Sequence, residues 1–231
     1  MGVFCFTKIK LHSYQNQQLS IQQIIQQFIT DLNNTKWYEY VAVFSGIISV
    51  WYSSKENILV YPIGIISTII YVYLSIDGAL LGEASVNFYY TVMSIIGWYL
   101  WSKKDDENKV TLKITSATTK EWINHLLFFG AIYLIIYFGL STFKTYFYRE
   151  IKEGPIPWAD ALASAAAFTG MWLMTKKKVE SWYWWILTNI VSIPLYFVKH
   201  YVFTSVYYLV LLIMAFYGLA LWLKKLKKQT I

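Results

Sequence analysis

The sequence predicts an all-α membrane protein in which an N-terminal amphipathic helix precedes seven transmembrane helices, arranged as two parallel three-helix bundles joined by a linker helix. Composition is the first observation: the 231 residues are 57% hydrophobic and 14% charged, more apolar surface than one soluble core can hide. The second is a series of seven apolar segments, and the third is a pattern shared by the two halves. The chain therefore needs a lipid bilayer around it.

The amphipathic helix is predicted over residues 19–32, within an N-terminal segment that covers residues 1–36. Its apolar residues fall on one helical stripe, opposite glutamines; they are Ile21, Ile24, Ile25, Phe28, Ile29 and Leu32. We expect this helix to lie on the membrane surface or to dock on the bundle.

The seven apolar segments cover residues 39–54, 58–76, 84–101, 122–140, 157–175, 182–198 and 204–223. Each is about long enough to cross a hydrocarbon layer of roughly 30 Å as a helix. Backbone polar groups in lipid must be satisfied within the segment, which favours helices over isolated strands. Residues 37–101 are the first predicted bundle, 102–156 a loop plus the linker helix, 157–223 the second bundle and 224–231 a basic tail.

Basic residues predict the orientation of these spans. If the N-terminus lies outside the cell, thirteen of the twenty Lys and Arg residues fall in cytoplasmic segments, so the positive-inside rule places the C-terminus in the cytoplasm. The same distribution explains the net charge of +7 without a nucleic-acid partner, since the cations sit in short loops and at the C-terminal end.

Two stretches about 125 residues apart share a spaced pattern. The first contains Trp51, Lys55, Glu56, Gly64, Ser67 and Tyr71, and the second contains Trp172, Lys176, Glu180, Asn189, Ser192 and Tyr196. Each half closes with Gly-x3-Trp, at Gly97 and at Gly218. Chance matching in helices rich in Trp and Tyr is the alternative to duplication. A duplication predicts a site between two like-oriented halves.

Polar and aromatic residues inside the apolar segments are the candidate site. Asn87 and Asn189 need hydrogen-bond partners in hydrocarbon, and on position alone interhelical bonding and ligand contact are equally good explanations. Trp182, Trp185 and Asn189 share one helical face. An interfacial belt explains Trp182 but explains Trp185 and Asn189 less well. A wall of rings beside an amide suits a flat polar ring, and a cationic pyridinium or thiazolium in particular.

Other chemistry finds little support in the sequence. Cys5 is the one cysteine, the three histidines are scattered, and no metal, cofactor or catalytic motif is recognisable. No carboxylate lies deep within a span, which favours passage down a gradient over an ion-driven pump. The rival hypotheses are a membrane-embedded assembly subunit, with the aromatic stripe as a helix–helix seam, and a membrane enzyme, which the missing catalytic residues disfavour.

With these residues in view, the chain resembles the Pnu family of vitamin transporters, and within it the PnuC type that carries nicotinamide riboside. The strongest stretch is Glu180-x-Trp182-x-x-Trp185-x-x-x-Asn189-x-x-Ser192. Further matches, in order, are Trp37-x-Glu39, Lys55-Glu56-Asn57 with Pro62 and Gly64, Gly97-Trp98-Tyr99-x-Trp101, Pro157-x-x-Asp160, Tyr208 and Gly218-x3-Trp222. The resemblance covers nearly everything from Trp37 to Trp222.

The resemblance implies a fold related to sugar transporters of the SWEET type, assembly as a homotrimer in the bacterial cytoplasmic membrane, and facilitated diffusion by alternating access. A cytoplasmic nucleoside kinase would trap nicotinamide riboside, a vitamin B3 precursor for NAD biosynthesis. Trp182 and Trp185 would stack on the nicotinamide ring, and Asn189 and Ser192 would hydrogen-bond the amide or ribose. Tyr90 and Tyr208 complete the expected site, with Asn87 where many members show Gln. That departure leaves thiamine or riboflavin as the alternative substrate.

Overall fold

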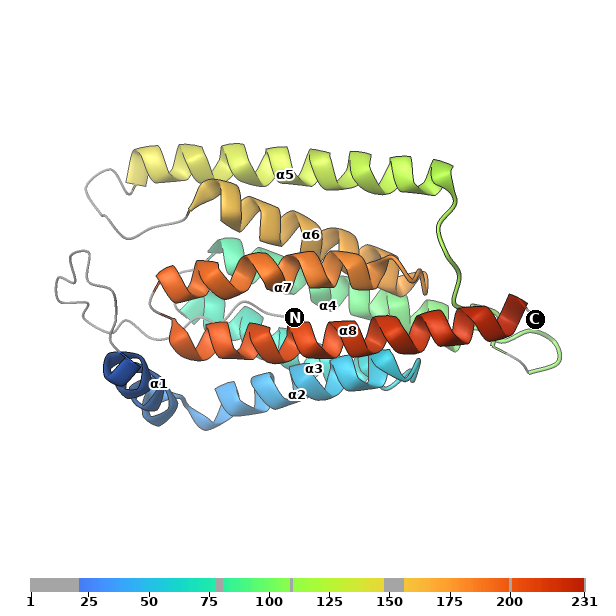
Figure 1. The fold of residues 1–231 in the computed structure, drawn as a ribbon, viewed down its shortest axis with the longest axis horizontal. Coiled ribbons are helices and arrows are strands. Elements are labelled where there is room, and N and C mark those ends of the chain that lie inside the picture. Colours follow the sequence, from blue (N-terminus) through green and yellow to red (C-terminus); the bar gives the residue numbers. More distant parts are fainter. Residues whose placement is uncertain (1–20, 78–80, 109, 148–155, 200, 231) are drawn as a thin grey trace.

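A computed structural model describes residues 21–77, 81–108, 110–147, 156–199 and 201–230. Eight helices make up the regular structure of this part of the chain (Figure 1). They are α1 (Ile21–Asn34), α2 (Trp37–Ser54), α3 (Val60–Asp77), α4 (Leu81–Ser102), α5 (Thr119–Phe147), α6 (Pro157–Thr175), α7 (Ser181–Val198) and α8 (Val202–Thr230). Each predicted span falls on one of α2 to α8. All-helical architecture is thus confirmed for the described residues.

Packing divides the long helices into two groups. In the first, α3 contacts α2 and α4; in the second, α7 contacts α6 and α8. The two groups meet where α2 contacts α8 and where α4 contacts α6. Helix α5 packs mainly on α6, reaches α7 where Phe129 meets Trp184 at a ring-centroid distance of 4.8 Å, and lies along the outside of the molecule (Figure 1).

The two groups repeat with a constant displacement. Helix α3 begins at Val60 and α7 at Ser181, and they end at Asp77 and Val198, a spacing of 121 residues that also separates Glu56 from Lys177. The turns after α2 and α6 agree, because Glu56 (φ 59°) and Lys177 (φ 51°) both adopt the left-handed conformation. Equivalent positions in the two groups are therefore 121 residues apart. The predicted alignment matched Glu56 with Glu180 and Gly64 with Asn189, whereas the helix ends match them with Lys177 and Trp185.

One end of the bundle gathers lysines, and we call it the lysine end; it carries Lys55, Lys103, Lys176, Lys177 and Lys225. Contacts between elements place these residues together, since Lys225 Nζ donates to the Lys55 carbonyl at 3.1 Å and Lys177 follows α6 directly. The opposite end, where α6 begins and α7 ends, is held by a 2.7 Å ion pair between Lys199 and Asp160.

The connection from α4 to α5 crosses the lysine end. Thr115 exchanges two backbone hydrogen bonds with the α6–α7 turn, from its N–H to Lys177 O at 3.1 Å and from the Val179 N–H to its own carbonyl at 3.0 Å. Glu180 Oε1 accepts hydrogen bonds from Ser116 Oγ at 2.7 Å and from the Ala117 N–H at 2.8 Å. The Glu180 carboxylate thus has the structural role expected of a carboxylate near a span end.

Length and composition qualify three described helices to cross a membrane, α3, α5 and α8. Helices α2, α4, α6 and α7 fall short of that hydropathy because Trp, Tyr, Ser and small residues replace aliphatic ones where they pack. They still range from 18 to 22 residues, long enough to span roughly 27–33 Å at 1.5 Å per residue. That these four helices also cross the membrane, which would make seven spans in all, stays a prediction.

Helix α1 corresponds to the predicted amphipathic helix, whose first two residues lie outside the described ranges. It contacts α8, where Phe28 packs on Phe203 with ring centroids 5.7 Å apart. Its isoleucines Ile21, Ile25 and Ile29 remain 50–77% exposed. Docking on the bundle therefore leaves an apolar stripe uncovered, as a helix at a lipid surface requires.

Candidate functional site

A cavity lies at the centre of the two packed groups. Its lining comes from six helices, α2, α3, α4, α6, α7 and α8, and encloses about 60 Å³. One water needs about 10–15 Å³ by this measure, so the space holds roughly four to six waters. A nucleoside is larger, so in this conformation the site is contracted and must widen to admit one.

The predicted aromatic wall faces this cavity. Trp182, Trp185 and Asn189 all line it, and they are 1%, 8% and 2% exposed. Helical spacing explains the arrangement, since residues three and four apart share a face. Both rings therefore lie inside the bundle, between its two groups of helices.

Close packing fixes the orientation of Trp182. A Cβ added at Gly218 would lie 2.3 Å from its Cη2, so the ring edge occupies the place of a side chain on α8. Its other neighbour is Trp222, edge-on at a centroid distance of 5.6 Å and an angle of 85°. Such an edge-to-face contact restricts the ring. Trp182 is held in place before any ligand arrives.

Trp185 is seated in a similar way on α6. A Cβ added at Gly170 would meet its ring atoms at 3.2–3.3 Å. Tyr90 approaches it from α4 at a centroid distance of 6.3 Å. The indole is thus supported from two helices while it lines the cavity.

Two polar atoms of this wall lack a hydrogen-bond partner within the described part of the chain, Asn189 Oδ1 and Trp182 Nε1. Burying such groups unsatisfied costs on the order of 1–3 kcal/mol each. One is an acceptor and the other a donor. Their position in the lining makes them available to a polar guest.

The facing wall, which the sequence analysis missed, carries hydroxyl groups. Ser49, Ser53, Ser67, Thr68 and Ser94 line the cavity from α2, α3 and α4. Two of these hydroxyl groups donate their hydrogen bonds to neighbouring backbone carbonyls. Ser49 donates to Val60 O at 2.8 Å, and Ser67 to Ala42 O at 2.8 Å. The oxygens that remain towards the cavity are lone-pair acceptors, which favour a guest that is a cation or rich in donors.

Tyr61 is a further residue of the lining that the sequence analysis did not select. It is 1% exposed, and its hydroxyl oxygen has no hydrogen-bond partner in the described residues. A Cβ at Gly97 would lie 2.3 Å from its ring, and Trp101 meets it edge-on at 5.1 Å and 88°. The repeated Gly-x3-Trp was the available signal, because it marks the seat of an aromatic ring in both halves.

The other four predicted site residues are buried near the cavity but are not part of its lining: Asn87, Tyr90, Ser192 and Tyr208. Tyr90 supports Trp185, as above. Tyr208 stacks on Tyr196 at 5.2 Å and 12°. The Asn87 carbonyl accepts a hydrogen bond from Thr91 Oγ1 at 3.0 Å. A direct contact between these four residues and substrate stays a prediction, and it requires the cavity to widen.

Comparison with known proteins gives a consistent set of similarities. The sequence model of a family described as nicotinamide mononucleotide transporter matches residues 36–224. The nicotinamide riboside transporter PnuC of Escherichia coli K12 is 22% identical over 213 residues, 84% of this chain and 87% of that protein. The riboflavin/roseoflavin transporter RibM of Streptomyces davaonensis is 22% identical over 189 residues, 80% of this chain and 84% of that protein.

A solved structure is also similar, the crystal structure of the vitamin B3 transporter PnuC. It aligns with a TM-score of 0.62 and 23% identity, covering 89% of this chain and 88% of that one. At this identity the comparison supports the fold. The packing of these helices is therefore a fold that an experimentally determined structure shares.

Proposed function

The chain belongs to the nicotinamide mononucleotide transporter family, whose model covers residues 36–224, and on this premise we propose that it carries nicotinamide riboside across the membrane. One observation carries the proposal: Trp182, Trp185 and Asn189 line a buried cavity between the two helix groups. PnuC of E. coli, similar over most of its length, is named for nicotinamide riboside.

The two walls complement the chemistry of this substrate. Nicotinamide riboside has a positively charged pyridinium ring, a carboxamide and ribose hydroxyls. Indole faces attract a cationic ring, each by about 0.5–2 kcal/mol, and Asn189 Oδ1 accepts a hydrogen bond from an amide or hydroxyl. Ser49 and Ser67 donate their hydroxyl hydrogens to backbone carbonyls, which leaves their oxygens as acceptors for the ribose hydroxyl groups. Acceptors on one side and rings on the other thus satisfy both parts of the molecule.

Facilitated diffusion is the mechanism we propose. Among the described residues that line the cavity, none is Asp, Glu, Lys or Arg, so the site offers no carboxylate for coupling to protons or sodium. Movement is then set by the electrochemical gradient of the cationic vitamin, without coupling to a second ion, and access alternates from each side. Phosphorylation by a cytoplasmic nucleoside kinase adds charge to the substrate and keeps the gradient inward.

We further propose that α2–α4 and α6–α8 are two like-oriented transmembrane bundles joined by α5, in the bacterial cytoplasmic membrane with the C-terminus inside. The 121-residue spacing of α3 and α7 supports the repeat, and the cations of the lysine end support the orientation. A homotrimer is the proposed assembly. Light scattering of the detergent-solubilised protein tests it, and the mass of a single chain would exclude it.

Riboflavin is the second candidate, because RibM of S. davaonensis matches 80% of this chain. Its isoalloxazine is neutral and three rings wide, so it gains less from the indole faces and needs a larger opening of the cavity. Thiamine is a cationic ring compound, so it matches the two walls better than riboflavin does. It is therefore the more demanding competitor in a test of the substrate.

Transport into vesicles separates these candidates. Purified protein reconstituted in liposomes should equilibrate labelled nicotinamide riboside to the same final level with and without a proton or sodium gradient, provided that the membrane potential is clamped at zero. Unlabelled thiamine and riboflavin are added as competitors, and protein-free liposomes are the control. Uptake of thiamine or riboflavin in preference to the riboside would overturn the substrate, and accumulation driven by an ion gradient would overturn the mechanism.

A further inference from the structure

The two left-handed turns at the lysine end are the starting point. Glu56 and Lys177 occupy equivalent places after α2 and α6, with φ of 59° and 51°. A residue with a side chain pays about 1–2 kcal/mol to adopt this conformation, and glycine avoids that strain. Both halves nevertheless have a charged residue there, and the charges are opposite. A side chain at each turn must therefore have a use that offsets the strain.

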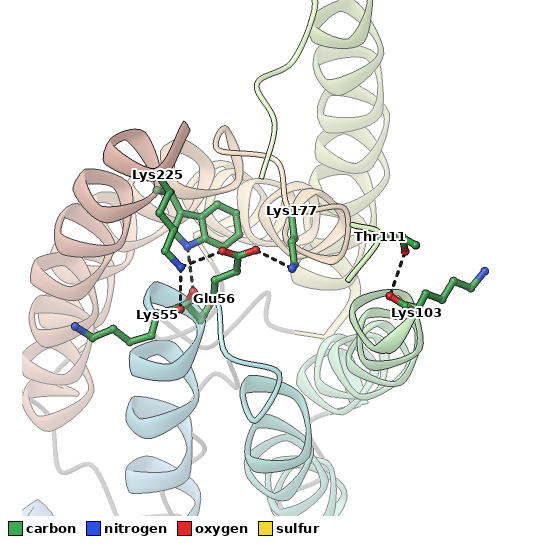
Figure 2. A network of polar contacts seen from close by, with 8 residues as sticks. Lys55, Glu56, Lys103, Thr111, Lys177 and Lys225 are labelled. Carbon is green, nitrogen blue, oxygen red and sulfur yellow. Dashed lines mark hydrogen bonds and ion pairs between the residues drawn. The ribbon is translucent and has the colours of Figure 1, made fainter. Parts of the chain in front are cut away.

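In the structure, the side chains of Glu56 and Lys177 connect the two halves of the molecule (Figure 2). Glu56 Oε1 lies 2.8 Å from Lys177 Nζ, and Glu56 Oε2 lies 3.0 Å from Lys225 Nζ. The Lys177 side chain is 4% exposed and that of Glu56 20%, so solvent screens this pair weakly. Every bond in the cluster joins the α2–α3 turn to the second half, at α6–α7 or at α8.

Neighbouring contacts join the same elements. Trp222 Nε1 on α8 donates to the Ser53 carbonyl on α2 at 3.1 Å. The Lys177 ammonium also lies 4.6 Å above the ring of Trp101, at the end of α4. Three helices and two turns thus converge on the Glu56 carboxylate and its lysines.

This cluster lies between two cavities. The central one includes Ser53, Val60 and Tyr61 in its lining. A second one, at the lysine end, is lined by Glu56, Asn57, Ile58, Trp101, Ser102, Lys104, Val110 and Lys177. Tyr61 belongs to the first lining and Trp101 to the second, and their rings meet edge-on at 5.1 Å. A solute that passes from one cavity to the other must separate the rings of Tyr61 and Trp101.

We propose that Glu56, Lys177 and Lys225 form an ionic latch that holds the lysine end closed, and that each transport cycle breaks the Glu56–Lys177 contact. The opposite end differs, because its ion pair, Lys199–Asp160, joins α6 to α7 within one half and does not restrain the halves. Breaking a shielded pair is unfavourable when each charge is left alone, but Glu56 and Lys177 both line the second cavity, where water replaces the lost partner.

The latch rests on the proposed transport function only for its role in the cycle, so its first test measures opening without transport. In a Cys5→Ser background, Ser53→Cys places a thiol in the central cavity beyond the latch. A membrane-impermeant maleimide is applied from the lysine end of protein reconstituted in one orientation. Adding Glu56→Gln should raise the labelling rate by roughly tenfold or more, because removing one partner of a shielded pair leaves the remaining charge uncompensated and favours the open state. Asp160→Asn is the matched control, and it should leave the rate unchanged.

A second variant keeps the test decisive if Glu56→Gln folds poorly. Lys225→Ala removes the partly exposed half of the latch, which is 42% exposed, and should raise labelling in the same direction by about twofold to threefold. Unchanged labelling in both variants, or an equal rise in Asp160→Asn, overturns the latch. If the variants are labelled faster but the protein does not transport nicotinamide riboside, the latch stands and only the proposed substrate is overturned.

Discussion

The two halves of the molecule share a scaffold but present different chemistry to the cavity. Positions 121 residues apart are equivalent, so Tyr61 on α3 corresponds to Trp182 on α7 and Thr68 corresponds to Asn189. The ring is seated on a glycine in both halves, Tyr61 on Gly97 and Trp182 on Gly218. A symmetric frame therefore holds an asymmetric site.

One pair of positions accounts for much of this asymmetry. Gly64 stands where the second half has Trp185, and both residues line the cavity. A second indole at position 64 would fill the space that the first leaves open. The comparison indicates that the second half supplies the ring wall, while the first half supplies the room and the hydroxyl acceptors.

The largest effect is expected from substituting the glycines against which the aromatic rings pack. In Gly218→Ala the new methyl group lies 2.3 Å from Trp182 Cη2, so the ring must move and overpacking should lower the free energy of unfolding by about 1–3 kcal/mol. Nicotinamide riboside binding should also weaken by about tenfold or more, since the displaced ring belongs to the wall. Thermal unfolding and a binding titration measure the two effects.

Gly97→Ala is the control from the other half, with an equally short 2.3 Å approach to Tyr61. We expect a similar loss of stability and a clearly smaller loss of binding. Equal losses of binding in the two variants would contradict the division of roles between the halves.

Asn189→Leu should have the next largest effect, with opposite signs on stability and binding. Asn189 Oδ1 has no hydrogen-bond partner among the described residues, so replacing the amide by an apolar group of similar size should raise the unfolding temperature of the substrate-free protein. Binding should weaken by about tenfold, because one charge-assisted or neutral hydrogen bond is lost. A drop in both quantities would mean that the amide bonds to protein instead of substrate.

Thr68→Val, the equivalent change in the first half, should have the smallest effect. Thr68 Oγ1 lies 2.8 Å from Thr91 Oγ1, so the two hydroxyl groups share a hydrogen bond, and the variant loses about 1 kcal/mol of stability. Binding should fall only a few-fold, because several other hydroxyl oxygens remain in this wall. An effect on binding as large as that of Asn189→Leu would place the main polar contact in the first half.

The sequence predicted the helices well because apolar runs end at turns with charged or polar residues. The segment 157–175 coincides with α6 and 182–198 begins one residue inside α7. The predicted span 204–223 was shorter than α8, which ends at Thr230, because the helix continues through its lysines after the apolar run has stopped. Hydropathy reports the lipid-facing length, and backbone hydrogen bonding sets the helix length.

The lining of the cavity was predicted in part. The ring wall could be found because Trp182, Trp185 and Asn189 share one helical face, a pattern visible within a single segment. The hydroxyl wall could not, since serines such as Ser49 and Ser67 become a surface only when two helices pack together. The repeat was detected with the correct spacing of 121 residues at Trp51 and Trp172. Further on the alignment was shifted, because matching residue types aligned Gly64 with Asn189 while equivalent helix ends align it with Trp185.

Calorimetric titration of nicotinamide riboside into purified wild-type protein and Trp185→Ala tests the central claim most directly. Trp185 is 8% exposed and lines the cavity, so losing its ring face should weaken binding by roughly tenfold, the upper range for one cation–π contact. Trp98→Ala, at a tryptophan 43% exposed on the outer face of α4, should bind like wild type. Undiminished binding by Trp185→Ala in a protein that still binds the riboside would contradict the account.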